Sequence, residues 1–134
     1  MNFDIVQPDG WAKPKGYSNG IVVRGAGRLV FVAGQIAWDA NQRLVGKSYF
    51  VTQFAQALRN VVAVVEKAGG KPEHIVRMTI YVTDKQLYLA ATAELGTIWR
   101  EIVGKTWPAM SLVQVAALLE DDALVEIEAT ATLP

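Results

Sequence analysis

Glu126 and Glu128 are the carboxylates whose spacing could support chemistry. They alternate with apolar residues in the segment Leu124 to Thr132, so in an extended strand both side chains face the same side, roughly 7 Å apart. A carboxylate pair at that separation suits glycoside hydrolysis, in which one group acts as an acid and the other as a base or nucleophile. Alternation on a solvent-facing strand surface explains the pair equally well, and we favour that interpretation for Glu128.

The use of histidine and cysteine restricts the other common catalytic chemistries. The chain has one histidine, His74, and no cysteine. A site with several histidine ligands, a sulfur-ligated metal, a thiolate nucleophile and a disulfide framework are therefore excluded, and no metal site is expected. A Ser-His-Asp triad would have to use His74, which ends the polar segment Lys71 to His74, where an exposed surface position is the favoured interpretation.

Three glycine-containing segments each contain part of a nucleotide-binding loop without completing one. Gly46-Lys47-Ser48 precedes a predicted helix, but Asn41 occupies the position of the first glycine that a phosphate loop requires. Gly104-Lys105-Thr106 leads into Trp107-Pro108, where a helix should begin. Gly25-Ala26-Gly27 lacks the third glycine of a dinucleotide-binding fingerprint. Nucleotide binding is therefore not favoured.

The composition is that of one globular domain, residues 1–134. Apolar residues make up 51% of the chain and charged residues 19%, which is enough apolar material for a core. Thirteen basic and thirteen acidic residues cancel, so no nucleic acid partner is expected. The segment Met1 to Trp11 lacks a secretory signal pattern, and the central apolar run Val61 to Val65 is too short to span a membrane. We therefore expect a cytoplasmic protein without a membrane partner.

The first half of the chain predicts two strands and a long helix. Ile21 to Arg24 and Arg28 to Gln35 are β-rich and are joined by a short glycine-containing loop, the pattern of a hairpin. Ile36 to Lys47 is predicted to be a loop, and Ser48 is predicted to cap the helix Ser48 to Ala68. The residues that share the apolar face of this helix are Val51, Phe54, Leu58, Val61, Val62 and Val65. Gly69-Gly70 supplies a left-handed stop.

The second half predicts a strand, a helix and two more strands. Ile75 to Thr83 alternates, with Val76, Met78, Ile80 and Val82 on one face. Asp84 is predicted to cap a helix that ends near Gly104 and whose apolar stripe is Leu87, Ala91, Leu95, Ile98 and Ile102. Ser111 to Leu118 and Leu124 to Thr132 are predicted strands on either side of an acidic turn, Glu120 to Asp122.

The resulting order, β-β-α-β-α-β-β, predicts a two-layer α+β domain in which both helices cover one side of the sheet. The other side is expected to be mixed, with Tyr81, Leu112, Leu118 and Leu124 beside Glu126 and Arg77. Such a surface indicates a homo-oligomer whose sheets meet. The four tryptophans follow no basic pattern and are assigned to core and interface packing.

Three blocks of the sequence are distinctive in combination. They are Val30-Phe31-Val32-Ala33-Gly34-Gln35-Ile36 followed by Trp38-Asp39, then Ile75 to Asp84, then Trp107-Pro108-Ala109-Met110-Ser111 with Ala123 to Ala129. With these blocks in this order, the chain resembles the RidA family, also called the YjgF or L-PSP endoribonuclease family, from about Tyr17 to Ala131. The resemblance implies a chorismate-mutase-like fold and a homotrimer with a cleft at each subunit interface. It also implies hydrolysis of 2-imino and enamine acids to 2-keto acids and ammonia, without a metal or an organic cofactor.

The resemblance assigns residues to that cleft. Tyr17 matches a cleft tyrosine, Gly34 offers its backbone to the ligand beside Ala33, and Glu126 matches the carboxylate that positions the hydrolytic water. The main departure is Met110, next to Ser111, at the position where deaminating members have an arginine that holds the substrate carboxylate. A thioether cannot donate a hydrogen bond.

Further departures make the expected cleft more apolar than is usual in the family. Leu112 replaces a cysteine of some members, and Thr92 and Leu95 replace an asparagine and a tyrosine that are frequent on the second helix. The cleft is thus expected to bind a small metabolite that differs from the usual substrate. The candidates for a replacement cation are arginines that reach in from a neighbouring subunit, namely Arg24, Arg28, Arg77 and Arg100.

The leading hypothesis is a RidA-like homotrimer that hydrolyses a C=N bond without cofactor, with Glu126 as general base. Little or no activity on 2-aminoacrylate is expected, because Met110 provides no clamp for the acid group. The alternative is a non-catalytic ligand-binding or interaction trimer, in which Met110 and Leu112 seal the interface. Ribonuclease activity is a third hypothesis, and the zero net charge argues against it.

Overall fold

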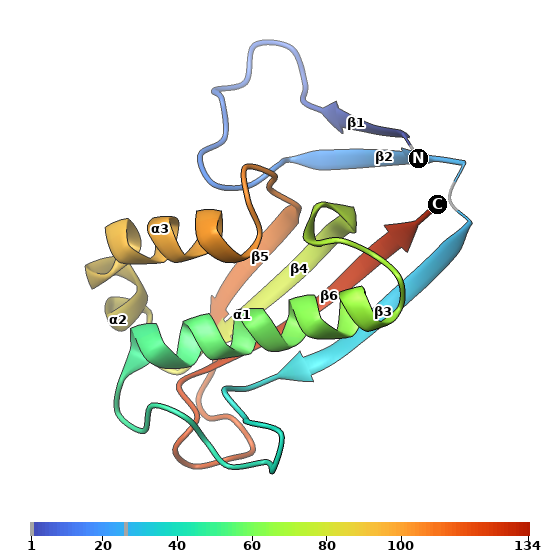
Figure 1. Ribbon diagram of the computed structural model, residues 1–134. Coiled ribbons are helices and arrows are strands. Elements are labelled where there is room, and N and C mark those ends of the chain that lie inside the picture. The colour runs from blue at the N-terminus through green and yellow to red at the C-terminus, as the bar shows by residue number, and fades with distance from the viewer. Residues whose placement is uncertain (1, 26) are drawn as a thin grey trace.

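The structure is a computed structural model that describes residues 2–25 and 27–134 (Figure 1). One residue of the predicted hairpin loop, Ala26, therefore lies outside the described residues. The elements in chain order are β1 (Asn2–Val6), β2 (Gly20–Arg24), β3 (Arg28–Gln35), α1 (Phe50–Lys67), a 3-10 helix (Pro72–His74), β4 (Ile75–Val82), α2 (Lys85–Ala90), α3 (Thr92–Ile102), β5 (Ala109–Gln114) and β6 (Val125–Leu133).

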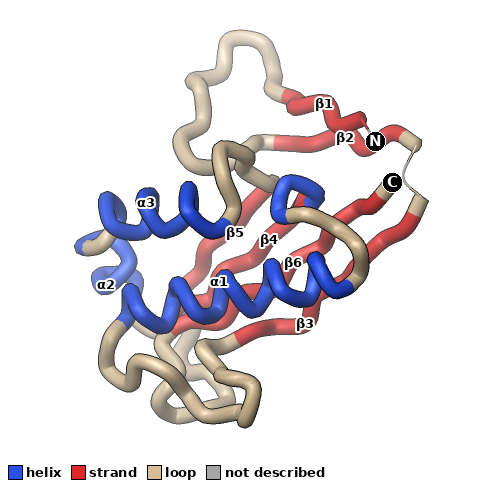
Figure 2. The backbone as a smooth tube through the Cα atoms, viewed as in Figure 1, coloured by secondary structure: helices blue, strands red, loops and turns tan. Residues whose placement is uncertain are grey.

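A four-stranded sheet in the order β3-β6-β4-β5 forms one layer of the domain. Strand β6 is antiparallel to both of its neighbours, whereas β4 and β5 are parallel. Parallel neighbours require a crossover connection, and α2 with α3 provides it. Helices α1 and α3 lie over the same face of the sheet (Figure 2). The predicted two-layer α+β architecture is confirmed, and we call the face under the helices the covered face and the other the open face.

The predicted pairing of the first two strands is wrong, although both strands exist. Strand β2 pairs with β1, a strand that the sequence analysis did not predict, in a separate two-stranded sheet. Strand β3 pairs instead with β6, and the amide of Gly27 extends this pairing by donating to the carbonyl of Leu133. A glycine-containing loop permits a hairpin but does not select the partner, since pairing depends on which other strands are available.

Helix α1 buries the predicted face, and Phe54, Leu58 and Val61 lie in the core. The predicted cap is wrong, because Ser48 has a φ of +68° and Tyr49 occupies the N-cap position without a side-chain cap. The amide of Tyr49 bonds to the carbonyl of Gly46, so a tight turn rather than a serine hydroxyl leads into the helix. The predicted stop is confirmed, as Gly69 has a φ of +94°.

Two irregularities alter the predicted faces of the second half. A register shift between Ile75 and Arg77 places Ile75 rather than Val76 in the core, while the alternation from Met78 onward follows the prediction. The predicted second helix is two helices, because the backbone leaves the helical region at Ala91. Asp84 caps α2 as predicted, by accepting a hydrogen bond from the amide of Gln86.

The break at Ala91 turns the apolar stripe of the second helix. Leu95 and Trp99 are the buried residues of α3, while Leu87 on α2 is exposed. Ile98 and Ile102, which the periodicity places on the stripe, are only half-buried. The predicted stripe is correct at Ala91 and Leu95, which are buried, but counting through the break placed Leu87 in it and left out Trp99.

The register of the sheet corrects the predicted content of the open face. Leu112 is paired with Ile80, whose side chain is in the core, so Leu112 belongs to the covered face. Leu124 also packs against the core, and Leu118 lies beyond the end of β5. The large apolar residues exposed on the open face include Phe31, 75% exposed, and Leu29, 56% exposed, from β3. Val113 of β5, which is paired with Tyr81, is 42% exposed.

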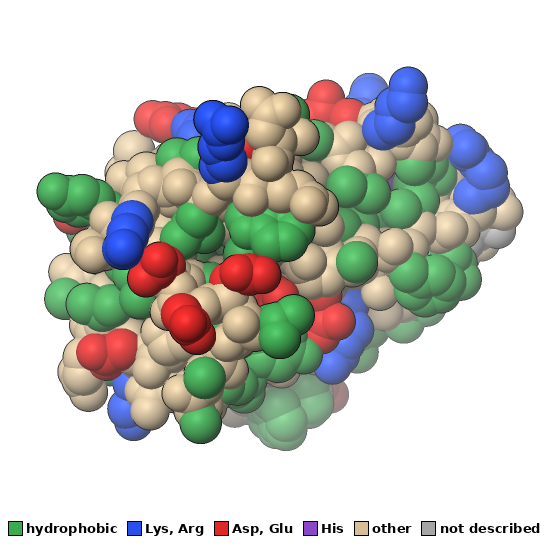
Figure 3. Space-filling view, turned by 90° about the horizontal axis from the view of Figure 1, so that it is seen from below, with side chains coloured by type: hydrophobic (Ala, Val, Ile, Leu, Met, Phe, Trp, Pro, Cys, Tyr) green, Lys and Arg blue, Asp and Glu red, His purple; other side chains and the backbone are tan. Residues whose placement is uncertain are grey.

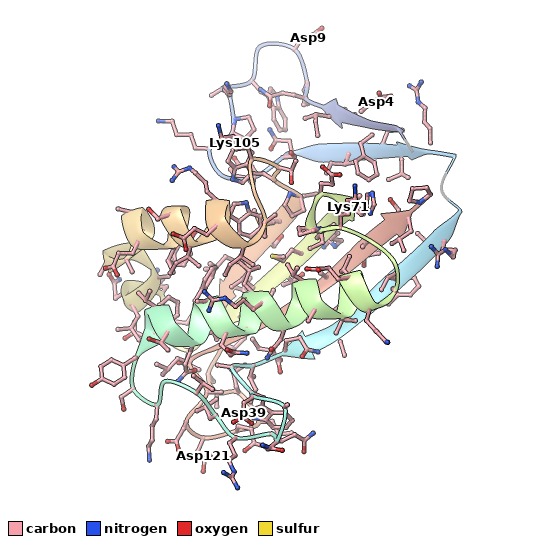
Figure 4. All side chains as sticks on the ribbon, in the orientation of Figure 1. Asp4, Asp9, Asp39, Lys71, Lys105 and Asp121 are labelled. Atoms are coloured by element: carbon pink, nitrogen blue, oxygen red, sulfur yellow. The ribbon has the colours of Figure 1, made fainter. Side chains whose placement is uncertain are left out.

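The loops before α1 and β6 meet at one end of the domain and are tied to it by Gln53. Its side chain is fully buried, donates to the carbonyls of Gly46 and Asp122, and accepts from the amide of Leu124. Figure 4 shows Asp39 and Asp121 at this end, and Figure 3 views it directly, with acidic side chains among hydrophobic ones. The buried amide thus fixes the segment that leads into β6. In the described part of the chain, no helix is long and apolar enough to cross a bilayer.

Candidate functional site

A pocket of about 290 Å³ lies beside the edge strand β5. Its walls come from β5, from α3 and from the segment that precedes β2. The predicted site residues that line it are Tyr17, Thr92, Met110, Ser111 and Leu112. Residues that the resemblance assigned from distant parts of the sequence therefore lie around one cavity, which we call the Met110 pocket.

The segment that carries Tyr17 is held against the start of β5 by Ser18. The Ser18 hydroxyl donates to the carbonyl of Trp107 at 2.7 Å, and its amide donates to the carbonyl of Pro108 at 3.1 Å. Ser18 also forms an isolated bridge with Ala109. Ser18 itself is buried, so Tyr17 is held at the pocket by backbone pairing rather than by a flexible loop.

Aromatic residues that the sequence analysis assigned to packing form further walls of the Met110 pocket. Trp99 and Trp107 both line it, and the indole of Trp99 donates to the carbonyl of Thr106 at 3.0 Å. Leu95, one turn before Trp99, also lines the pocket. The spacing of four residues was the available signal for Trp99, because it places both side chains on one helix face. Trp107 carried no such signal.

The Met110 pocket has one charged lining residue among those that the structure describes. Lys15 is the one charged residue among its described lining residues, and no carboxylate lines it. Met110 itself packs against the core beside Met78, its register partner on β4. The pocket is therefore apolar at its base, and its formal charge comes from Lys15.

Gly34 and Glu126 line a different pocket, of about 280 Å³, between β3 and the loops at the end of the domain. A Cβ atom on Gly34 would lie 2.9 Å from Cδ of Glu126, which is closer than real Cβ contacts. Only a glycine at this position leaves room for the Glu126 side chain as it lies. Ala33, which the resemblance also assigned, lines neither this pocket nor the Met110 pocket.

The two groups of predicted site residues lie on opposite faces of the sheet. Glu126 is paired with Tyr81 on the open face, whereas Met110 is paired with Met78 on the covered face. Strand β4 lies between the strands that carry Glu126 and Met110. A single chain therefore does not bring Glu126 into the Met110 pocket.

Glu128 has a partner of its own on the open face. The Tyr81 hydroxyl donates to Oε2 of Glu128 at 2.5 Å. This hydrogen bond, and then the loss of solvent around the phenol, raise the pKa of Tyr81 above its ordinary value of 10.0. Glu128 thus acts as a hydrogen-bond acceptor in the sheet, in line with the structural interpretation favoured for it.

Other polar residues that could do chemistry have local structural roles. His74 accepts a hydrogen bond at Nδ1 from the amide of Lys71 and so closes the 3-10 turn. The amides of Asn41 and Arg43 donate to Asp39 and lower the pKa of its carboxyl group. Over residues 2–25 and 27–134, no three histidine, aspartate or glutamate side chains cluster as a metal site would require.

A larger cavity, of about 550 Å³, adjoins the Met110 pocket and was not predicted. It lies between the β1–β2 hairpin and Trp107, with Phe3, Ile5 and Ile21 among its apolar walls. Gly16, Tyr17 and Trp107 line both cavities. Lys105, which Figure 4 shows on the loop leading into β5, also lines it.

Comparison with known proteins identifies the family. The family model described as endoribonuclease L-PSP matches residues 11–133 of the chain. The chain belongs to this family, the RidA or YjgF family. The matched range includes both groups of candidate site residues.

Curated relatives of this RidA-family chain have similar lengths. A RutC family protein of Synechocystis sp. is 35% identical over 136 residues, which cover 100% of this chain and 99% of the relative. A protein of Salmonella typhimurium named 2-iminobutanoate/2-iminopropanoate deaminase is 37% identical over 105 residues, which cover 78% of this chain and 80% of the relative.

Solved structures show the same fold. A Rid-family protein of Yersinia pestis, YyfB, has a TM-score of 0.84 at 34% identity and covers 99% of this RidA-family chain and 100% of its own. The TdcF protein of E. coli, solved with bound serine, has a TM-score of 0.69 at 31% identity and covers 93% of this chain and 92% of its own. The mixed α+β fold is therefore that of the family.

Proposed function

We propose that this RidA-family protein is a homotrimer that binds a small metabolite in clefts between subunits and hydrolyses a C=N bond there without a cofactor. The observation that carries the proposal is the division of the site, since Met110 and Tyr17 line one pocket and Glu126 and Gly34 line another. In an interfacial cleft, the Met110 pocket of one subunit meets the Glu126 side of its neighbour, and each subunit contributes to two clefts.

The open face supports assembly. Phe31 is 75% exposed there, beside the Tyr81–Glu128 hydrogen bond, in a surface that no helix covers. An exposed phenylalanine on a strand leaves apolar surface in contact with water in a monomer, which is unfavourable, whereas contact with another subunit buries that surface. A sheet that packs against copies of itself gives these side chains a partner.

Glu126 is the residue assigned to the reaction. In imine hydrolysis, a water molecule adds to the C=N carbon, the nitrogen receives a proton, and the tetrahedral adduct releases ammonia to leave a C=O group. A carboxylate near that water accepts its proton as the C–O bond forms. Glu126 is half-buried and no side chain in the described part of the chain forms a hydrogen bond with it, so its carboxylate is available to water.

The specificity differs from that of arginine-bearing relatives. Met110 offers no hydrogen bond to an acid group, and a hydrogen bond to a charged group is worth about 1.5–3 kcal/mol. We therefore expect little or no release of pyruvate from 2-aminoacrylate generated by an oxidase or a dehydratase. Turnover equal to that of an arginine-bearing relative would contradict this specificity.

A subunit-mixing experiment tests the divided site. Imines are generated in place from a panel of amino acids by an amino-acid oxidase, and release of keto acid above the uncatalysed rate is measured. Glu126→Gln removes the base, and Tyr17→Ala opens the other half of the cleft. After denaturation and joint refolding, mixed trimers of the two inactive chains should regain activity at clefts that receive both intact halves.

The controls decide between outcomes. Each variant refolded alone should stay inactive, and each should elute as a trimer in size-exclusion chromatography with light scattering. Activity that does not return in the mixture, or a monomeric wild-type protein, would contradict the interfacial site. Saturable binding of a metabolite without any product, unchanged by Glu126→Gln, would favour the non-catalytic ligand-binding trimer.

A further inference from the structure

We propose that Lys15 is the cation of the Met110 pocket and that the pocket selects carboxylates that carry an aromatic or branched apolar side chain. This inference rests on the proposed function, because it names the substrate class of the same cleft. Lys15 would take the place of the missing arginine, and it comes from the segment of the same chain that also carries Tyr17.

The charge balance around Lys15 favours an anionic ligand. Lys15 is the charged residue that lines the Met110 pocket, and no aspartate or glutamate lines it. In residues 2–25 and 27–134, the salt bridges join Arg24 to Asp4 and Lys47 to Asp122, so Lys15 forms none. Within one chain, an ammonium group that lines an apolar cavity without a carboxylate beside it attracts an acid group from solution.

The backbone holds Lys15 at the pocket. Ser18, three residues later, is fixed to Trp107 and Pro108 by two hydrogen bonds. Gly16 has a φ of +75°, a left-handed conformation that favours glycine, so the chain turns between Lys15 and Tyr17. The turn and the tether together keep both side chains beside β5, while the exposed lysine stem remains free to reach a bound ligand.

The arginines of the chain are less well placed. Arg24 pairs with Asp4, and Arg28 donates to the carbonyl of Ala68. Within one chain, Arg77 lies on the open face, on the far side of the sheet from Met110, so it can approach the pocket only from a neighbouring subunit. Arg100 is the nearest competitor, since its guanidinium lies 3.9 Å from the position that a Cβ atom of Gly96, a lining residue, would occupy. Arg100 itself does not line the pocket.

The apolar walls determine the rest of the ligand. Phe54, Ile80 and Leu112 line the pocket together with Met110 and Trp99. The cavity of about 290 Å³ is near the lower end of the range for small-molecule pockets, roughly 300 Å³. A methyl side chain would leave most of these walls in contact with water, whereas a phenyl or isobutyl group would cover them. Each additional buried methylene strengthens binding about fourfold.

Because Lys15 holds a carboxylate less firmly than an arginine does, the ligand needs an aromatic or branched apolar side chain. A lysine ammonium is a mobile point charge, whereas an arginine holds a carboxylate through two parallel hydrogen bonds. Lys15 is exposed, so its attraction for an acid group is screened by water and salt. Apolar contact therefore has to supply most of the affinity, and the smallest imino acids lack the surface for it.

Equilibrium binding to the intact protein tests the proposal without requiring turnover. Isothermal titration calorimetry with stable 2-keto acids compares phenylpyruvate, 4-methyl-2-oxopentanoate and pyruvate, and phenylacetate with uncharged phenylacetamide. We expect phenylpyruvate and 4-methyl-2-oxopentanoate to bind at least about tenfold more tightly than pyruvate. Phenylacetate should bind more tightly than its amide at low ionic strength, and the difference should shrink as salt is added.

Three variants locate the cation. Lys15→Gln should weaken phenylpyruvate binding about fivefold, the upper range for an exposed ion pair, and Lys15→Arg should restore it. Lys13→Gln is the matched control, because it removes the same charge two residues away, from the neighbouring cavity, and it should leave binding within about twofold. Equal thermal midpoints would show that all three variants are folded.

The outcomes separate this inference from the proposed function. Equal binding of pyruvate and phenylpyruvate, or a loss of binding in Arg100→Gln but not in Lys15→Gln, would overturn the inference even if imines are hydrolysed. Binding as described, with hydrolysis unaffected by Glu126→Gln, would leave Lys15 as the cation of the pocket and would instead contradict the proposed role of Glu126.

Discussion

The two faces of the four-stranded sheet differ in how complete they are within one chain. On the covered face, Met78 and Ile80 are buried by α1 and α3, and the core is closed. On the open face, Phe31 stays 75% exposed, and Tyr81 and Glu128 form a hydrogen bond that no helix shields. The same alternation along the same strands produces both faces, so the difference lies in what covers them.

This difference explains why the candidate site is divided. A face that is closed by helices can hold a pocket only at its edge, which is where β5 and Met110 lie. The open face presents a carboxylate, Glu126, in a separate pocket that loops rather than helices enclose. The two halves complement each other only if the open face of one copy meets the edge of another.

The largest expected effect concerns a matched pair of leucines. Leu58→Ala, on α1 over the covered face, should lower the free energy of unfolding by about 2–5 kcal/mol, because its side chain is fully buried. Leu29→Ala makes the same change on the open face, where the side chain is 56% exposed, and should cost less than about 1 kcal/mol. Urea denaturation at low protein concentration measures both. Equal losses of unfolding free energy in the two variants would contradict the difference in burial between the covered and the open face.

The next effect concerns assembly. Phe31→Lys places a charge in the open face and should convert the proposed trimer to monomers, because burial of a phenylalanine contributes about 1.5–3 kcal/mol to each contact. Light scattering measures the mass, and circular dichroism checks that the fold is kept. Tyr49→Lys, at an exposed aromatic residue that precedes α1, is the control and should leave the mass unchanged. A trimer that survives Phe31→Lys would place the interface elsewhere.

A smaller effect concerns the close approach of Gly34 to Glu126. Gly34→Ala would bring a methyl group within 2.9 Å of Cδ of Glu126, so the carboxylate must move. The displaced atoms end a flexible side chain, and the free energy of unfolding should therefore change by less than about 1 kcal/mol. Imine hydrolysis should nevertheless fall about tenfold or more, because misplaced catalytic groups lose rate steeply. Unchanged kcat would show that the position of Glu126 does not matter.

The smallest expected effect is a pH dependence of folding stability that comes from Tyr81. The hydrogen bond to Glu128 raises the pKa of Tyr81 in the folded protein above its ordinary value of 10.0. The neutral phenol therefore stabilises the folded state below pH 10, and this contribution is lost as the pH rises through the raised folded value. Urea midpoints of wild type and Tyr81→Phe should differ at pH 8 to 9 and converge at higher pH. Glu128→Gln should lower the titration midpoint of Tyr81 in tyrosinate absorbance, and a midpoint that stays in place would contradict the assigned cause.

Much of the fold could be predicted from local patterns. The apolar face of α1, the stop at Gly69 and the alternation of β6 follow directly from side-chain periodicity and backbone preference. Strand β1 was not predicted, although the turn sequence Pro8-Asp9-Gly10 follows it, because a run of only five residues carries a weak strand signal.

The remaining errors share a physical cause. The hairpin of β2 with β3, the unbroken second helix and the placement of Leu112 on the open face each required knowledge of a partner strand or of a backbone irregularity. A bulge near Ile75 or a break at Ala91 changes which side chains face the core without altering the composition of the segment.

The candidate site, like the fold, was predicted in part from the sequence, and the rest depended on tertiary contacts. The sequence supplied the residue types, including Glu126, Met110 and Tyr17, because family resemblance acts on residues in order along the chain. It did not supply Lys15, Trp99 or Trp107 as pocket residues, because their meeting depends on the hydrogen bonds of Ser18 and of the Trp99 indole.

The sequence by itself determined where helices and strands could form, which chemistry was excluded and that the arginine clamp is absent at Met110. Those properties belong to single residues and short periodic segments, so they are readable without coordinates. Only the tertiary structure decided that Met110 and Glu126 lie on opposite faces of one sheet and that Lys15 lines the pocket. Strand order and register set these relations, and both arise from contacts between segments far apart in the chain.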